Sequence, residues 1–277
     1  MKILILSLLF LTHSSWASQR DVVYGEDNRL DYYEVKDPAL KEYARATATK
    51  VPSIYLRKFG KEIILRHYKL EDRGICASER FSQQNTAGAC SGFLVGPDTL
   101  MTAGHCVRNM NDCKNFRWIF DYRMDNADQK IKVTPEQIFT CKKIISQKLD
   151  PVPGEDFAII QLDRTIKDRT PLKISPAGTL RIGTPLIVIG YPSGLPVKIA
   201  GGGSVRNMEK NWFVANLDTF QGNSGSAVLN ADTGAVEGIL VRGENDYVDD
   251  PVKKCKIVNV CPDQGCRGEE VNFVPRN

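Results

Sequence analysis

The chain is poor in histidine, and this scarcity limits the chemistry that it can perform. Only His13, His67 and His105 occur among its 277 residues. Zinc sites usually need paired histidines or C-x2-C pairs, whereas the cysteines near the C-terminus are spaced C-x5-C-x4-C. We therefore expect no metal and no cofactor. His13 falls in a segment that we expect to be removed, which leaves two histidines as candidate bases.

Long apolar runs are missing beyond the first residues. The run Ile3–Leu11 follows Lys2 and is apolar except for Ser7, but it is too short to span a bilayer. Ser15-Trp16-Ala17 places small residues where a signal peptidase cleaves. We expect residues 1–17 to be a signal peptide cleaved after Ala17, and the mature protein to be secreted or periplasmic without membrane association.

A strong charge of one sign is also missing. Lys and Arg number 37 against 33 Asp and Glu, a net charge of +4, and no dense basic run occurs. This balance gives no reason to expect a nucleic-acid partner, and we expect a monomer.

Cysteine, in contrast, is present in an even number, and every cysteine lies downstream of the signal. An even count in an exported chain favours disulfides over free thiols. The eight positions are Cys76, Cys90, Cys106, Cys113, Cys141, Cys255, Cys261 and Cys266.

The secondary-structure pattern after a polar N-terminal segment is mainly β. Asp37-Pro38 begins a short helix that ends near Ala46, with Asp as N-cap and Pro at the first position. Aromatic residues then alternate with mostly polar ones from Phe116 to Arg123. Further runs typical of strands are 62–67, 92–95, 157–162, 185–190, 213–216 and 236–241. Many short strands between turn residues predict an all-β barrel or sandwich.

Two motifs predict nucleophilic catalysis. Thr102-Ala103-Gly104-His105-Cys106 surrounds an imidazole with small residues, and Gly222-Asn223-Ser224-Gly225-Ser226 places a serine in a glycine-rich turn. A serine hydroxyl attacks only when a base removes its proton, so we expect His105 to be that base and Ser224 the nucleophile. The glycines allow a sharp turn, from which the amides of Gly222 and Ser224 form an oxyanion hole.

An orienting acid is expected at Asp156. This residue stands at the mouth of the apolar run 157–162, where a carboxylate can be fixed and partly buried. The carboxylate would hold the imidazole in the correct tautomer and stabilise the imidazolium. The chain order His, Asp, Ser is that of chymotrypsin.

These motifs resemble those of chymotrypsin-like serine peptidases, in particular their bacterial glutamyl-endopeptidase (V8-like) branch. The resemblance implies two antiparallel six-stranded β-barrels with the active site in the cleft between them. It implies an N-terminal segment at 18–50, a first barrel over 51–165 that carries His105 and Asp156, and a second over 166–277 that carries Ser224 and a Cys-rich tail. Protein or peptide substrates follow from the same resemblance.

The resemblance also implies a disulfide between Cys90 and Cys106, which pins the hairpin that carries the histidine. Cys113 and Cys141 flank the strand pair after the histidine loop, so we expect them to form a second disulfide. The other four cysteines allow three pairings, which the sequence does not rank.

The sequence allows more than one hypothesis for the side chain that the substrate pocket prefers. In trypsins an Asp six residues before the serine lies at the base of the primary pocket, and Asp218 has this offset, so cleavage after Arg or Lys is one hypothesis. A structural Asp218 is the other. Val241 and Gly243 would bind the peptide as an added strand. Cleavage after Glu is the alternative, although this segment lacks the usual pocket histidine and has Arg242, which could favour acidic residues or shield Asp218.

Two rival functions stay open. One is a catalytically silent binding protein with a peptidase fold, and the other is a general esterase. Covalent labelling of Ser224 by a fluorophosphonate distinguishes an enzyme from the first, and peptide against ester turnover distinguishes a peptidase from the second.

Overall fold

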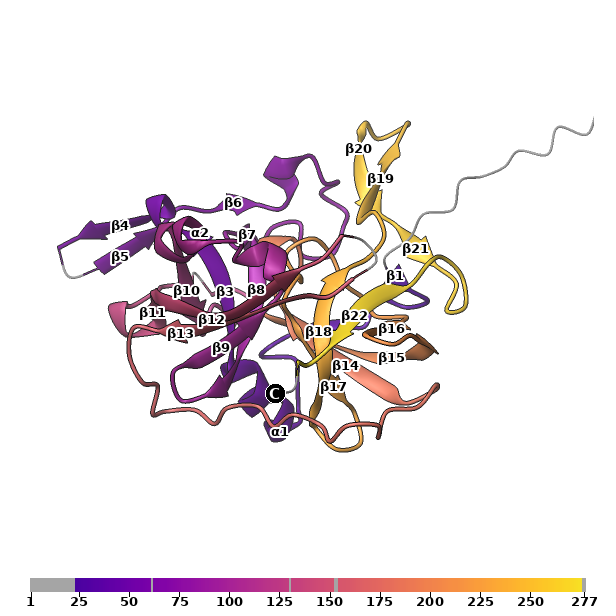
Figure 1. The fold of residues 1–277 in the computed structure, drawn as a ribbon. Coiled ribbons are helices and arrows are strands. Elements are labelled where there is room, and N and C mark those ends of the chain that lie inside the picture. The colour runs from indigo at the N-terminus through magenta and orange to yellow at the C-terminus, as the bar shows by residue number, and fades with distance from the viewer. Residues whose placement is uncertain (1–22, 61, 130, 152–153, 276–277) are drawn as a thin grey trace, which may run out of the picture.

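The computed structural model describes residues 23–60, 62–129, 131–151 and 154–275. The predicted signal peptide lies outside the described residues. Two curled antiparallel sheets lie side by side and form most of the molecule (Figure 1). No helix in the described ranges is long and apolar enough to cross a membrane.

The first sheet has seven strands in the order β11-β10-β3-β8-β9-β13-β12. It curls, but its end strands do not pair with each other within the described residues. Its strands are β3 Thr47–Pro52, β8 Cys90–Gly96, β9 Thr99–Thr102, β10 Phe116–Phe120, β11 Ile138–Phe139, β12 Cys141–Leu149 and β13 Asp156–Leu162.

The second sheet closes into a six-stranded barrel, because β14 pairs with both β17 and β15. A seventh strand, β2, pairs with β15 at the edge of this barrel. The strands are β2 Arg29–Asp31, β14 Pro185–Gly190, β15 Lys198–Met208, β16 Trp212–Ala215, β17 Ala227–Asn230, β18 Val236–Arg242 and β22 Glu269–Phe273. The predicted all-β, two-barrel architecture is therefore confirmed, with one closed barrel and one curled half-barrel.

The segment expected to lie outside the barrels contributes to both. Residues 29–31 add strand β2 to the second barrel, and strand β3 of the first begins at Thr47. Between them the predicted helix is confirmed as α1, Pro38–Arg45, with the Asp37 carboxylate accepting from the Ala39 amide at 2.8 Å.

Smaller elements project from the barrels. Hairpins β4–β5 and β19–β20 stand out from the body at two separate places (Figure 1). The remaining elements are β1 Val23–Tyr24, β4 Leu56–Phe59, β5 Glu62–Leu65, β6 Tyr68–Lys69, β7 Asn85–Thr86, β19 Tyr247–Asp250, β20 Cys255–Val258, β21 Val260–Cys261, α2 Met110–Asn115, and the 3₁₀ turns η1 Ser53–Tyr55, η2 Glu71–Arg73, η3 Gly104–Cys106, η4 Pro135–Gln137 and η5 Pro192–Gly194.

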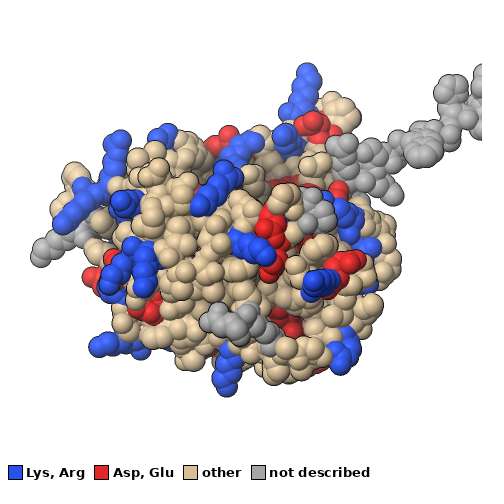
Figure 2. Space-filling view, viewed as in Figure 1, with Lys and Arg blue, Asp and Glu red and all other residues tan. Residues whose placement is uncertain are grey.

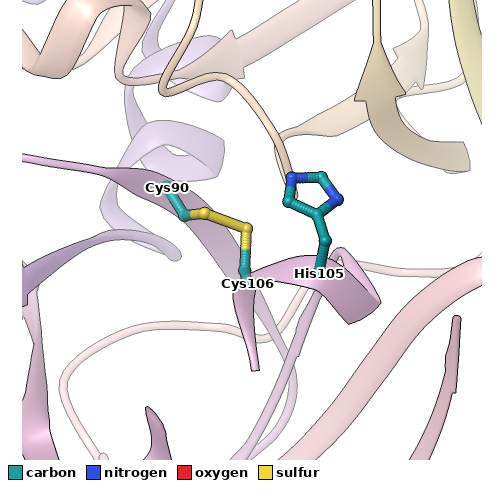
Figure 3. Close-up of side chains that lie close together, drawn as sticks. All are labelled: Cys90, His105 and Cys106. Carbon is teal, nitrogen blue, oxygen red and sulfur yellow. A yellow bond between two sulfur atoms is a disulfide. The ribbon is translucent and has the colours of Figure 1, made fainter. Parts of the chain in front are cut away.

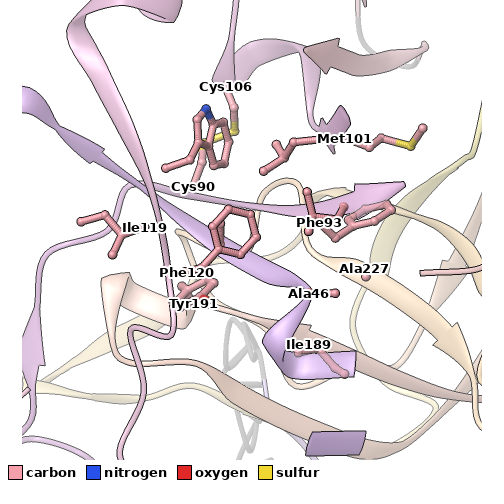
Figure 4. Close-up of a cluster of buried hydrophobic side chains, with 14 of the residues drawn as sticks. Ala46, Cys90, Phe93, Met101, Cys106, Ile119, Phe120, Ile189, Tyr191 and Ala227 are labelled. Atoms are coloured by element: carbon pink, nitrogen blue, oxygen red, sulfur yellow. A yellow bond between two sulfur atoms is a disulfide. The ribbon is translucent and has the colours of Figure 1, made fainter. Parts of the chain in front are cut away.

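A shared hydrophobic core extends from the first barrel into the second (Figure 4), and a separate buried cluster lies within the second barrel. Phe93 and Phe120 of the first barrel and Ile189 and Ala227 of the second are all fully buried in the shared core. Tyr191 joins them, since its hydroxyl donates to the Thr47 carbonyl across the interface at 3.1 Å. Each large apolar side chain buried here stabilises the fold by about 1.5–3 kcal/mol. The shared core thus fixes the two barrels against each other and holds the faces of the cleft in register.

Candidate active site

His105 lies on the turn η3, directly after strand β9. A side chain at Gly104 would overlap the Lys148 carbonyl oxygen, so only glycine lets the turn pack this closely on β12. The next residue, Cys106, forms a disulfide with Cys90 on β8 (Figure 3). The imidazole is held by its backbone and is 29% exposed, so it can meet a substrate.

Asp156 is the first residue of β13, as its position before an apolar run predicts. Its side chain is buried, and its two oxygens accept from the two donors of His105: the backbone amide at 2.9 Å and Nδ1 at 2.8 Å. The carboxylate acceptor places the proton on Nδ1 and leaves Nε2 free to accept. Burial by itself raises the pKa of Asp156, but the hydrogen bonds and charge of His105 outweigh it, so the pKa lies below its usual range.

Arg242 is a third member of this network, with a role that the sequence does not indicate. One of its terminal nitrogens lies 3.5 Å from Oδ2 of Asp156, and the other donates to Glu270 at 2.8 Å. It does not shield Asp218, which was one of the roles expected for it. Its charge instead helps to keep Asp156 ionised.

Ser224 lies on a sharp turn that packs against the strands leading to His105. The turn has left-handed backbone at Gly222 (φ 102°) and Gly225 (φ 89°), and a side chain at Gly225 would overlap the Ser91 carbonyl and the Thr102 hydroxyl. The Ser91 amide donates to the Ser224 carbonyl at 2.8 Å, and Cys106 Sγ lies 3.6 Å from the same oxygen. The two motifs, more than a hundred residues apart, therefore meet in space.

The cysteines form four disulfides. They join Cys90 to Cys106 and Cys113 to Cys141, which are the two pairs expected from the sequence, and Cys76 to Cys255 and Cys261 to Cys266. Cys90, His105 and Cys106 also cluster tightly enough to suggest a metal site (Figure 3). Metal ions bind thiolates, however, and both sulfurs here are consumed by the disulfide. The cluster is therefore a covalent anchor for His105.

A cavity of about 120 Å³ opens beside Ser224. Val241 and Gly243, predicted to bind substrate, both line it, together with Glu244, Asp246 and Glu269. The cavity has one lining cation, Arg242, which is already paired with Glu270, and Glu244 is paired with Arg267, which lies outside the lining. Among the described residues, Asp246 and Glu269 have no ion-pair partner. The cavity is therefore acidic; in the following text it is called the acidic pocket.

Asp218 does not line this pocket, and the structure gives it another task. Its oxygens accept from the amide of Tyr24 at 2.8 Å and from that of Asn28 at 2.7 Å, and its side chain is buried. Burial raises its pKa to about 6, against the two hydrogen bonds, which lower it. The structure thus favours the second reading of this residue, as an anchor for the N-terminal segment.

Glu269 is the buried acid of the pocket, and no local sequence motif marks it. It is 1% exposed, accepts from the Thr219 hydroxyl, and lies so close to Gly243 that a side chain there would overlap its carboxylate. Burial raises its pKa to about 8, and the hydrogen bond from Thr219 offsets this only in part. A cation bound beside this carboxyl would favour its ionised form.

Comparison with known proteins agrees with this geometry. The family model for the trypsin-like peptidase domain matches residues 90–239, more than half of the chain. Alpha-fibrinogenase albofibrase of Trimeresurus albolabris is 26% identical over 121 residues, which cover 42% of this chain and 43% of that protein. Thrombin-like enzyme flavoxobin of Protobothrops flavoviridis is 29% identical over 115 residues, covering 39% and 40%. The chain thus spans less than half the length of these relatives.

Solved structures with the same fold include the VesB protease of Vibrio cholerae, with a TM-score of 0.52 and 15% identity over 89% of this chain and 64% of that one. Neuropsin, a serine protease of mouse brain, gives a TM-score of 0.51 and 14% identity over 84% and 90%. A Glu endopeptidase gives 0.48 and 20% over 85% and 91%. The match to the family model, on a two-barrel fold that brings the motifs of His105 and Ser224 together, shows that the chain belongs to the trypsin-like peptidase domain family.

Proposed function

We propose that the protein hydrolyses peptide bonds through a triad of His105, Asp156 and Ser224. The pairing of both Asp156 oxygens with His105, beside the turn that presents Ser224, is the observation that carries this proposal. It prepares His105 Nε2 to accept a proton, which is what a serine nucleophile requires.

The reaction follows from these positions. Ser224 Oγ attacks the carbonyl carbon of the substrate, and its proton passes to Nε2 of His105. The C–N bond then breaks while His105 returns that proton to the leaving amine, which leaves an acyl ester on Ser224. A water molecule, deprotonated by His105, attacks this ester and releases the acid.

The oxyanion of the tetrahedral intermediate would be held by the amides of Gly222 and Ser224. Neither amide donates a hydrogen bond to another residue in the part of the chain that the structure describes. The left-handed backbone of Gly222 belongs to the same turn. Each such donor typically contributes about 3 kcal/mol to transition-state stabilisation.

The same proposal includes cleavage after Arg or Lys, with Glu269 in place of Asp218 as the recognising acid. Supporting it, Asp246 and Glu269 line the acidic pocket without an ion-pair partner among the described residues, whereas Glu244 is paired with Arg267. The one guanidinium lining the pocket is paired with Glu270 and Asp156. A glutamate substrate would meet repulsion from the ionised carboxylates of this pocket, and more strongly as Glu269 ionises towards pH 8, which argues against the glutamyl alternative. Four disulfides further support export to an oxidising compartment.

Active-site labelling tests the proposal. A fluorophosphonate should add covalently to Ser224, and mass spectrometry of the digested protein should locate the adduct there. Mixing the enzyme with a reactive arginine ester at low pH should trap an acyl adduct on the same residue. Absence of both adducts from a correctly folded protein would favour the catalytically silent alternative.

A further inference from the structure

We propose that a second cavity, across the Gln221–Gly222 bend from the acidic pocket, binds an acidic side chain in the part of the substrate that follows the cleaved bond. The cavity has a volume of about 300 Å³, and we call it the basic pocket. The proposal rests on the peptidase function proposed above and adds the chemistry of the leaving segment to it.

The position of the basic pocket indicates that it binds the part of the substrate that follows the cleaved bond, which we call the leaving side. Gln221 lines both pockets, but the acidic pocket continues to Ser224 whereas the basic pocket continues to Gly222 and Ala89. Ala89 precedes Cys90, whose disulfide holds the residue next to His105. If the side chain before the cleaved bond fills the acidic pocket, the residues after that bond cross Gly222 towards the basic pocket.

The walls of the basic pocket carry a cation and no acid. Tyr55 of η1, Tyr68 of β6 and Arg73 of η2 line it, and none of its lining residues is Asp or Glu. The Arg73 guanidinium donates to the Ser193 carbonyl at 2.5 Å, which fixes its position without neutralising its charge. Among the described residues, no carboxylate lies within ion-pair distance of Arg73.

The acidic neighbours of Arg73 in the sequence are occupied elsewhere. Glu71 accepts from the Lys69 ammonium at 3.3 Å and from the Gln83 amide. Asp72 accepts from the Lys69 backbone amide at 2.9 Å. Neither forms an ion pair with the guanidinium. The charge of Arg73 also lowers the pKa of Asp246 in the acidic pocket, against the larger effect of burial, which raises it. Because no ion pair joins these two residues within the described part of the chain, the guanidinium can still bind a ligand.

A second cation strengthens the field of the pocket. The Arg66 guanidinium lies 5.1 Å from the centre of the Tyr68 ring and 5.7 Å from that of Tyr55. Lys and Arg side chains also gather over the projecting β4–β5 hairpin, which begins directly after Tyr55 (Figure 2).

The ligand that fits this arrangement is a carboxylate on a short aliphatic stem. A guanidinium can bind a carboxylate through two parallel hydrogen bonds, and the tyrosine rings offer apolar area for the methylene groups. Because Arg73 is exposed, we expect discrimination of about fivefold between Glu and its neutral isostere Gln.

Acyl transfer tests the leaving side separately from cleavage itself. The enzyme is acylated with an arginine ester, and two dipeptide amides compete to take the acyl group from Ser224. The pairs are Glu-Ala-amide against Gln-Ala-amide and Ala-Glu-amide against Ala-Gln-amide, with product ratios measured by mass spectrometry. At one of the two positions the Glu product should exceed the Gln product about fivefold.

Charge reversal provides the decisive variant. Arg73→Glu should turn the preference towards a Lys-containing dipeptide over its Gln counterpart, whereas damage to the loop alone would remove selectivity without reversing it. Equal Glu and Gln products at both positions with the wild-type enzyme would overturn the proposal, and this arm needs no variant to fold. Failure of the ester to react at all would instead overturn the proposed function.

Discussion

The acidic and basic pockets are neighbours that share Gln221 yet have opposite charge. One places Glu244, Asp246 and Glu269 beside Ser224, and the other places Arg73 beside Gly222 with no acid in its lining. Complementary charge contributes to orientation and specificity more than to affinity. The contrast therefore suggests that the cleft selects the direction and register of a peptide as well as one side chain.

The two pockets can select a peptide for cleavage only if His105 and Ser224 catalyse the reaction. Ser224→Ala and His105→Ala should each lower kcat by roughly six orders of magnitude, because nucleophile and base act as one unit. Turnover of a peptide substrate, with thermal melting to confirm folding, measures this. His67→Ala is the matched control, since His67 is exposed and, among the described residues, its ring bonds only the Leu65 carbonyl. Near-normal turnover by His105→Ala would contradict the proposed triad.

Replacing the carboxylate of Glu269 should weaken the preference of the acidic pocket for basic substrate side chains. Glu269→Gln keeps the shape and should lower the ratio of kcat/KM for Arg over Gln substrates by about 10- to 100-fold, the loss of a charge-assisted contact. Asp218→Asn is the control and should leave this ratio unchanged. If Asp218→Asn lowers the ratio and Glu269→Gln does not, the recognising acid is Asp218.

Raising the pH should strengthen the preference of the acidic pocket for Arg over Gln substrates. The pKa of Glu269 is raised to about 8, so below that pH the free enzyme must release a proton to bind a cation. The Arg-over-Gln ratio should rise with pH by up to tenfold per unit below about 8 and then level off. In Glu269→Gln the ratio should stay flat from pH 6 to 9. A wild-type ratio that falls over this range would contradict the assignment.

The smallest expected effect concerns Asp218, which does not line the acidic pocket. Asp218→Asn should reduce the free energy of unfolding by about 1–3 kcal/mol, because one amide of the N-terminal segment loses its acceptor. Urea denaturation measures this loss. An unchanged midpoint would show that the segment is held by other contacts, such as the pairing of β1 with β21.

Local signals explain which parts of the fold the sequence predicts. The Asp37 cap defines α1, and an apolar run between turns gives β14 with its bounds. Strand β15 was missed, because Gly201-Gly202-Gly203 is typical of a turn. Its extended form depends on pairing with β14, β16 and β2, which are distant in the sequence.

The residues of the site also differ in whether the sequence predicts them. His105 and Ser224 stand in local motifs whose glycines are required by close packing, so the sequence indicates them directly. Glu269 has no such motif. It reaches Gly243 because the register of β18 and β22 pairs Arg242 with Glu270, and register is a tertiary property. The sequence leaves the role of Asp218 open between two hypotheses, because its offset from Ser224 carries no information on the amides of Tyr24 and Asn28.

If the protein cleaves after basic residues, as proposed, the disulfide between Cys76 and Cys255 affects the lifetime of the enzyme. The turn of the projecting β19–β20 hairpin contains Lys253 and Lys254, both exposed, so the protein would be its own substrate there. A cut after either lysine leaves Cys255 on the downstream piece, still joined to Cys76 on the upstream piece. Self-nicked molecules would keep β22 in place and migrate as one species until a reductant separates the two fragments.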